Sequence, residues 1–238
     1  MSQGDGPDAS PGWGGHETGA PPAGKVKAKH AASYIVDPMA RGLLRLHISP
    51  DAITVIGSLG AVVASLALFP SGHLVAGAIV VAVFALSDML DGSMARQSGR
   101  IGPWGAFLDS TLDRLTDASV FAGLAIWYLQ GDDQPLLGYA ALYCLVAGQI
   151  VSYTRARAEG LGLKAAGGLA ERTERMVIIL TTTGIGALGV PYLQAIGLWA
   201  LVVATTITVL QRMLMVRRQT RPAAAGESVA DSASDGQA

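Results

Sequence analysis

Four aspartates in two closely spaced pairs are the residues of this sequence whose types and spacing could do chemistry. Asp88 and Asp91 are three residues apart, and Asp109 and Asp113 are four apart, so each pair shares one face if its segment is helical. The segment between the pairs is short and contains glycine, which lets two helices turn back and face each other. Four carboxylates brought together would repel one another unless cations lay between them, and oxygen ligands favour Mg²⁺, Mn²⁺ or Ca²⁺.

A centre with two metal ions would suit phosphoryl transfer. The ions bridge phosphate oxygens and neutralise the developing charge, and one carboxylate could serve as general base for an incoming hydroxyl. One alternative is that the aspartates only cap helices or pair with nearby arginines. Another is a non-enzymatic divalent cation transporter, but the stretch "ASVFAGLAIWYL" that follows Asp117 carries no charge to continue an ion path. Because carboxylates among apolar helices are costly, we favour a functional site.

The composition indicates that a membrane protein must position these groups. Of the 238 residues, 50% are hydrophobic and 15% are charged, against roughly 25% charged residues in an average soluble domain. The net charge of −1 gives no reason to expect a nucleic-acid partner. The single cysteine, Cys144, excludes an intrachain disulfide.

Six apolar runs predict an all-α integral membrane protein with six transmembrane helices. The third helix is expected to begin near Gly105 and to carry the second aspartate pair in its first two turns. The runs are continuous, without the alternation of a membrane β-barrel. They are Ile53–Phe69, Leu74–Leu86, Ala118–Leu129, Leu136–Val151, Met176–Val190 and Ile196–Met215.

The basic residues predict the orientation. All 17 lie in the termini, in the even-to-odd loops or in the adjoining helix ends, so we expect both termini and the aspartates on the cytoplasmic side of the cell (plasma) membrane. The segment "YIVDPMARGLLRLHISPD" has apolar residues at helical spacing and predicts an interfacial amphipathic helix before the first span. The ends are rich in Gly, Pro, Ser and Ala, which predicts disordered cytoplasmic tails over 1–33 and 219–238 around a membrane domain of 34–218.

The aspartates belong to a longer pattern of eight positions that resembles the signature of the CDP-alcohol phosphatidyltransferases. The resemblance covers roughly residues 34–218 and implies a six-helix membrane enzyme, usually a homodimer. Such an enzyme displaces CMP from a CDP-linked lipid with an alcohol and uses divalent metal. The eight positions are Asp88, Asp91, Gly92, Ala95, Arg96, Gly105, Asp109 and Asp113.

The same resemblance implies roles for particular residues. Two Mg²⁺ ions, or Mn²⁺, would be held by Asp88, Asp91, Asp109 and Asp113, and Asp113 would also deprotonate the acceptor hydroxyl. The turn "PDAIT" would contact the nucleotide as well. Together the expected CDP-diacylglycerol contacts are Pro50, Asp51, Thr54, Gly92, Arg96, Gly102 and Gly105.

Residues in the second half of the chain are expected to determine which acceptor alcohol is used. Arginines at three cytoplasmic helix ends could bind a phosphorylated acceptor, because guanidinium groups match phosphate geometry; positive-inside anchoring would produce such arginines too. The segments "SYTRARAEGLGL" and "ERTERM" resemble the actinobacterial phosphatidylinositol phosphate synthases, whose acceptor is 1D-myo-inositol 3-phosphate (L-myo-inositol-1-phosphate). Glycerol-3-phosphate, giving phosphatidylglycerophosphate, is the alternative acceptor for the same chemistry. Carried over by position, the inositol phosphate would bind to Ser152, Arg155, Arg175 and Arg212.

Overall fold

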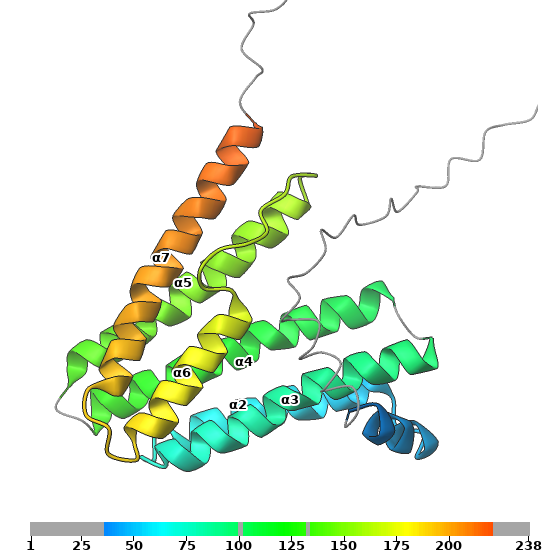
Figure 1. Cartoon of the computed structure of the whole chain (residues 1–238), viewed down its shortest axis with the longest axis horizontal. Coiled ribbons are helices and arrows are strands. Elements are labelled where there is room, and N and C mark those ends of the chain that lie inside the picture. Colours follow the sequence, from blue (N-terminus) through cyan, green and yellow to red (C-terminus); the bar gives the residue numbers. More distant parts are fainter. Residues whose placement is uncertain (1–35, 100–101, 132–133, 221–238) are drawn as a thin grey trace, which may run out of the picture.

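The described part of the chain consists of helices joined by turns and loops, without strands. The computed structural model describes residues 36–99, 102–131 and 134–220, so nearly all of the predicted tails lies outside the described residues. Residues 36–45 form a short helix, and six longer helices follow, arranged as Figure 1 shows. They are α2 (Pro50–Leu68), α3 (Leu74–Ser98), α4 (Pro103–Gln130), α5 (Pro135–Glu159), α6 (Arg172–Gly186) and α7 (Leu193–Gln219).

Local sequence signals explain where these helices begin and end. Proline occupies the first turn of α2, α4 and α5, where its missing N–H is not needed for an intrahelical bond. The hydroxyl of Ser49 accepts from the backbone N–H of Ala52 at 3.2 Å and caps α2. At the other end of α3, Gly99 adopts a left-handed conformation with φ of 67°, which costs glycine little.

The six longer helices pack around one apolar core, with α2 antiparallel to α3 and α5 parallel to α7. In Figure 1, α2 lies beside α3, and α5 lies beside α7, while α4 and α6 join the two pairs. Val120, Phe121 and Leu124 of α4 are fully buried in this core. A side chain at Gly123 would place its Cβ 2.5 Å from the carbonyl oxygen of Ser65, so glycine allows the backbones of α2 and α4 to approach closely.

Four of the six predicted spans meet the length and apolarity that crossing a bilayer requires, namely α2, α3, α5 and α7. Large apolar side chains on their outer faces, such as Ile56, Val83 and Val203, are exposed, as expected for lipid contact. The α4 helix has 28 residues, but the charged residues between Asp109 and Asp117 lower the mean hydropathy of its first half. The α6 helix has only 15 residues and is about 22 Å long, against about 30 Å of hydrocarbon.

The start of α4 differs from the prediction. The helix begins at Pro103 rather than near Gly105, because proline is well suited to the first helical position. Asp113 therefore lies ten residues beyond the start of the helix, outside the first two turns in which it was predicted. The earlier start adds Trp104 to the helix, ahead of Phe107 and the aspartates.

Candidate active site

The two aspartate pairs face each other across α3 and α4, as their spacing predicted. One carboxylate oxygen from each of Asp88, Asp91 and Asp109 lies within 4.8 Å of the others. Asp91 is the most deeply buried of the three, with 8% of its surface exposed. The fourth aspartate, Asp113, lies one turn further along α4 and is bound by an arginine.

The donor set of this carboxylate cluster fits a hard divalent cation. Oδ1 of Asp109 is buried and has no hydrogen-bond partner among the described residues, which is costly for a carboxylate unless a ligand satisfies it. On the far side of the cluster, the hydroxyl of Thr54 donates to Oδ2 of Asp91 at 2.5 Å. A hydrogen bond from the neighbouring helix thus orients one carboxylate, as outer partners commonly do for metal ligands.

Arg172, at the first position of α6, links the two aspartate pairs. Its Nη2 lies 2.7 Å from Oδ1 of Asp113, and its Nη1 lies 3.3 Å from Oδ2 of Asp88. Arg172 is not among the predicted site residues, although it occurs in the same "ERTER" motif as the predicted Arg175. Two arginines three residues apart lie on overlapping helix faces, so the motif alone did not distinguish them.

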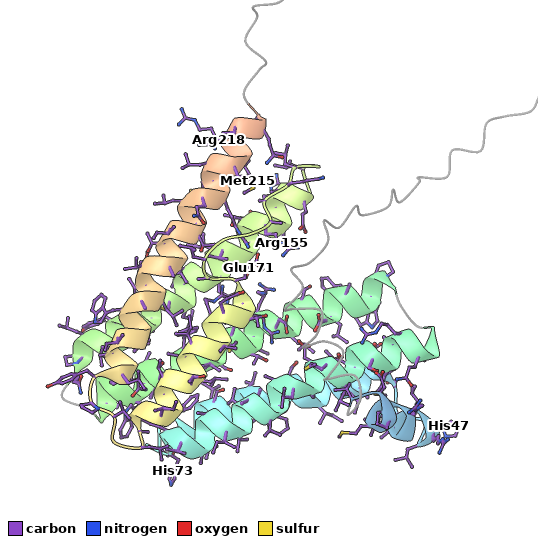
Figure 2. The ribbon with its side chains drawn as sticks, in the orientation of Figure 1. His47, His73, Arg155, Glu171, Met215 and Arg218 are labelled. Atoms are coloured by element: carbon purple, nitrogen blue, oxygen red, sulfur yellow. The ribbon has the colours of Figure 1, made fainter. Side chains whose placement is uncertain are left out.

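A cavity of about 800 Å³ adjoins Asp113 and Arg172. Its walls come from α4, α5, the start of α6 and α7, and its polar lining is rich in arginine. In Figure 2, Arg155 and Glu171 lie near each other beside this cavity. The polar and charged lining residues are Ser110, Thr111, Asp113, Arg114, Gln149, Ser152, Tyr153, Arg155, Glu159, Glu171, Arg172, Thr173 and Arg212.

Three of the four predicted acceptor residues line this cavity: Ser152, Arg155 and Arg212. Nε of Arg155 lies 2.9 Å from Oε1 of Glu159. The guanidinium of Arg212 is buried and donates to Glu171 at 3.2 Å and to two backbone carbonyls, so it also ties α7 to the loop before α6.

Arg175, the fourth, lies outside the cavity. Its surface is 0% exposed, and its Nη2 lies 2.5 Å from Oδ2 of Asp117 on α4. Its Nη1 donates to the carbonyl of Ala170 at 3.1 Å. This placement gives a buried ion pair between α4 and α6.

The residues expected to contact the nucleotide gather at the starts of α2 and α4. Pro50 and Thr54 are buried in the first turns of α2, and Oδ2 of Asp51 accepts from the indole of Trp104 at 3.2 Å. A Cβ at Gly102 or Gly105 would meet nothing within 4 Å, and one at Gly92 would meet only Nη1 of Arg96, at 3.5 Å. Open space therefore lies beside these glycines, where a ligand could approach the backbone.

The fold and the site together define a multi-pass membrane protein with a carboxylate centre for divalent metal beside an arginine-rich cavity. The family model of the CDP-alcohol phosphatidyltransferases matches residues 47–210, and the chain belongs to this family of transferases. The two aspartate pairs lie within the matched range, as do all residues that line the adjoining cavity except Arg212.

Similar proteins include synthases of one phospholipid. The phosphatidylinositol phosphate synthase of Streptomyces avermitilis is 43% identical over 87% of this chain and 89% of its own. The crystal structure of Mycobacterium tuberculosis phosphatidylinositol phosphate synthase with CDP-DAG bound is 44% identical, with a TM-score of 0.75 over 81% of this chain and 98% of its own. A second structure of that enzyme, in complex with manganese and citrate, also has 44% identity and a TM-score of 0.75, over 80% and 92% of the two chains.

Proposed function

We propose that this protein is a phosphatidylinositol phosphate synthase of phospholipid biosynthesis. It transfers the phosphatidyl group of CDP-diacylglycerol to 1D-myo-inositol 3-phosphate and releases CMP. The observation that carries the proposal is the arginine-lined cavity directly beside Asp113 and the carboxylate cluster, because it offers a phosphorylated alcohol a site next to a base. Two relatives that are 43% and 47% identical to this chain over the aligned residues are phosphatidylinositol phosphate synthases.

Asp88, Asp91, Asp109 and Asp113 would hold two Mg²⁺ ions, with Mn²⁺ as a substitute. When bound, the ions would neutralise the diphosphate of the lipid substrate and the charge that develops on the leaving phosphate. The orphaned Oδ1 of Asp109 and the oriented carboxylate of Asp91 support this assignment.

Asp113 would act as the general base, since it is the aspartate that lines the cavity. It takes the proton from the inositol hydroxyl, whose oxygen forms a bond to the phosphorus that carries diacylglycerol. The bond from this phosphorus to the oxygen of the CMP phosphate breaks, and the electron pair leaves with CMP. Arg172, whose Nη2 lies 2.7 Å from Oδ1 of Asp113, would direct this carboxylate toward the cavity.

The acceptor phosphate would bind to Ser152, Arg155, Arg172 and Arg212. Arg172 replaces Arg175 in this proposal, because Arg172 lines the cavity and Arg175 is buried against Asp117. A planar guanidinium can bind two phosphate oxygens at once. The CDP-diacylglycerol headgroup would lie against the open starts of α2 and α4, in contact with Pro50, Asp51, Thr54, Gly92, Arg96, Gly102 and Gly105.

We further propose six transmembrane helices, with both termini and the active site on the cytoplasmic face of the plasma membrane. The pairs Arg172–Asp113 and Arg175–Asp117 lie one turn apart and join α4 and α6 in the same direction, which supports parallel odd-numbered spans. The helix at residues 36–45 would lie on the membrane surface, with exposed Met39 and Leu46 in the lipid. A homodimer is proposed from the family resemblance.

The proposal is tested by CMP release from CDP-diacylglycerol in mixed micelles. Inositol phosphate, free inositol and glycerol-3-phosphate are offered separately, with Mg²⁺ or with excess chelator, to the native protein and to Asp113→Asn. We expect release only with inositol phosphate and Mg²⁺, and its loss in the variant. Release with glycerol-3-phosphate instead would keep the chemistry and reject the acceptor, whereas metal-independent release would reject the carboxylate mechanism.

A further inference from the structure

The turn that leads into α6 is held by a buried threonine of α7 that the proposed chemistry does not use. Thr208 is 0% exposed, and its Oγ1 accepts from the backbone N–H groups of Leu169 and Ala170, both at 3.1 Å. The same hydroxyl donates to the carbonyl of Ala204 at 2.7 Å, so its proton and both lone pairs are used. Threonines inside a helix commonly make only this last kind of bond. The two additional bonds connect α7 to the turn.

The methyl group of Thr208 also contacts this turn. Gly167 and Gly168 have φ values of 92° and 140°, in the half of conformational space that favours glycine. A Cβ at Gly168 would overlap Cγ2 of Thr208, so the backbone of the turn lies directly against the methyl group. The hydroxyl and the methyl of one threonine therefore fix successive residues of the turn.

Further hydrogen bonds connect the turn to the start of α6. The N–H of Gly167 donates to Oε1 of Glu171 at 3.1 Å, and Nη2 of Arg212 donates to the same oxygen at 3.2 Å. Glu171 is the N-cap of α6, and Arg172 is its first residue. Because only two residues separate Ala170 from Arg172, or at most about 7 Å of chain, a shift of the turn would move the backbone of Arg172.

We propose that Thr208 is a positioning residue for the transfer reaction, an inference that rests on the proposed function. Thr208 is not among the described residues that line the cavity, and it acts through Arg172. The guanidinium of Arg172 lies 2.7 Å from Asp113 and 3.3 Å from Asp88. These contacts tolerate little movement of the helix start, because an N–H···O contact beyond about 3.5 Å is no longer a hydrogen bond. By fixing the turn, Thr208 keeps this guanidinium between the two aspartate pairs, where it meets the acceptor phosphate.

The test removes the hydroxyl and the methyl group of Thr208 separately. Thr208→Val keeps the shape of the side chain but leaves the buried N–H of Ala170 without its acceptor, whereas Thr208→Ser keeps the hydroxyl. Gly168→Ala displaces the turn from the opposite side, and it serves as the second disrupting variant if Thr208→Val does not fold. Thr205→Val is the matched control, because Thr205 is also 0% exposed on α7 and its hydroxyl donates to carbonyls of its own helix.

The KM values for inositol phosphate and for CDP-diacylglycerol are measured by CMP release at a temperature where circular dichroism shows each variant folded. We expect Thr208→Val and Gly168→Ala to raise the KM for inositol phosphate about fivefold, the effect of losing one hydrogen bond. The KM for CDP-diacylglycerol should stay within about twofold, and Thr208→Ser and Thr205→Val should keep both values within about twofold. A purely structural role would reduce the amount of folded enzyme, and hence the apparent kcat, without changing either KM.

A double variant tests whether Thr208 acts through Arg172. If it does, Thr208→Val combined with Arg172→Lys should have the KM for inositol phosphate of Arg172→Lys alone, because the two changes affect the same contact. Multiplied effects would overturn the proposal. So would a native KM in the folded disrupting variant, or an equal rise in Thr205→Val, which would indicate general packing of α7. If the native protein releases no CMP with inositol phosphate and Mg²⁺, the proposed function fails first, and the positioning role fails with it.

Discussion

The buried ion pair between Arg175 and Asp117 provides the sharpest test of the structural reasoning. The side chains are 0% and 2% exposed, and their nearest atoms are 2.5 Å apart. Gly148 of α5 covers them, since a Cβ there would lie 3.1 Å from Oδ2 of Asp117 and 3.2 Å from Nε of Arg175. We expect Arg175→Met to leave the Asp117 carboxylate buried without a counter-charge.

The expected cost follows from this burial. Removing one partner of a fully buried pair costs about 3–5 kcal/mol, whereas replacing both partners by uncharged groups of similar volume is often close to neutral. Arg175→Met and Asp117→Leu should therefore each lower the free energy of unfolding by about 3–5 kcal/mol. The double variant should recover most of this loss, which gives a large coupling energy in a double-mutant cycle.

Two measurements are needed, because the sequence alone suggested that Arg175 binds the acceptor. Unfolding in micelles is followed by circular dichroism for the native protein and the three variants. The KM for inositol phosphate is then measured for the double variant, which we expect to keep a value within about threefold of the native one, a change worth under 1 kcal/mol.

The reasoning is refuted by the opposite pattern. If Arg175→Met unfolds like the native protein and its KM for inositol phosphate rises tenfold or more, Arg175 reaches the acceptor and the ion pair is unimportant. A double variant as unstable as the single variants would show that the pair does more than balance two buried charges.

Three further predictions concern the cluster, the cavity and the packing. Thr54→Val removes the hydroxyl that binds Asp91 and should raise the Mg²⁺ concentration for half-maximal CMP release about 10-fold or more; an unchanged metal dependence would contradict this role. Arg172→Lys loses the planar fork that reaches both aspartate pairs and should raise the KM for inositol phosphate about 10-fold, while Arg218→Lys at the exposed end of α7 should not. Gly123→Ala forces a Cβ to within 2.5 Å of a backbone carbonyl of α2 and should lower the free energy of unfolding by about 1–3 kcal/mol. If this variant unfolds at the same temperature as the native protein, α2 and α4 are less closely packed than the structure indicates.

The sequence by itself determined the helical class and the location of the carboxylate centre. The six apolar runs each overlap a helix, although the fifth run extends past the end of α6 at Gly186. Hydrophobic periodicity and length are local properties of a chain. The spacing of Asp88, Asp91 and Asp109 was sufficient to predict that their carboxylates meet, since residues three or four apart share a helix face and the linking turn is short.

Only the tertiary structure decided which arginine faces the cavity. Arg172 and Arg175 lie one turn apart in a single motif, and either could serve a phosphate. The packing of α6 against α3 and α7 places Arg172 beside Asp113 and directs Arg175 into the core beside Asp117. The contact between Trp104 and Asp51 likewise joins residues 53 positions apart in the sequence. Such choices depend on the register of one helix against another, which arises from side-chain packing over long sequence distances and leaves no periodic signal in either segment.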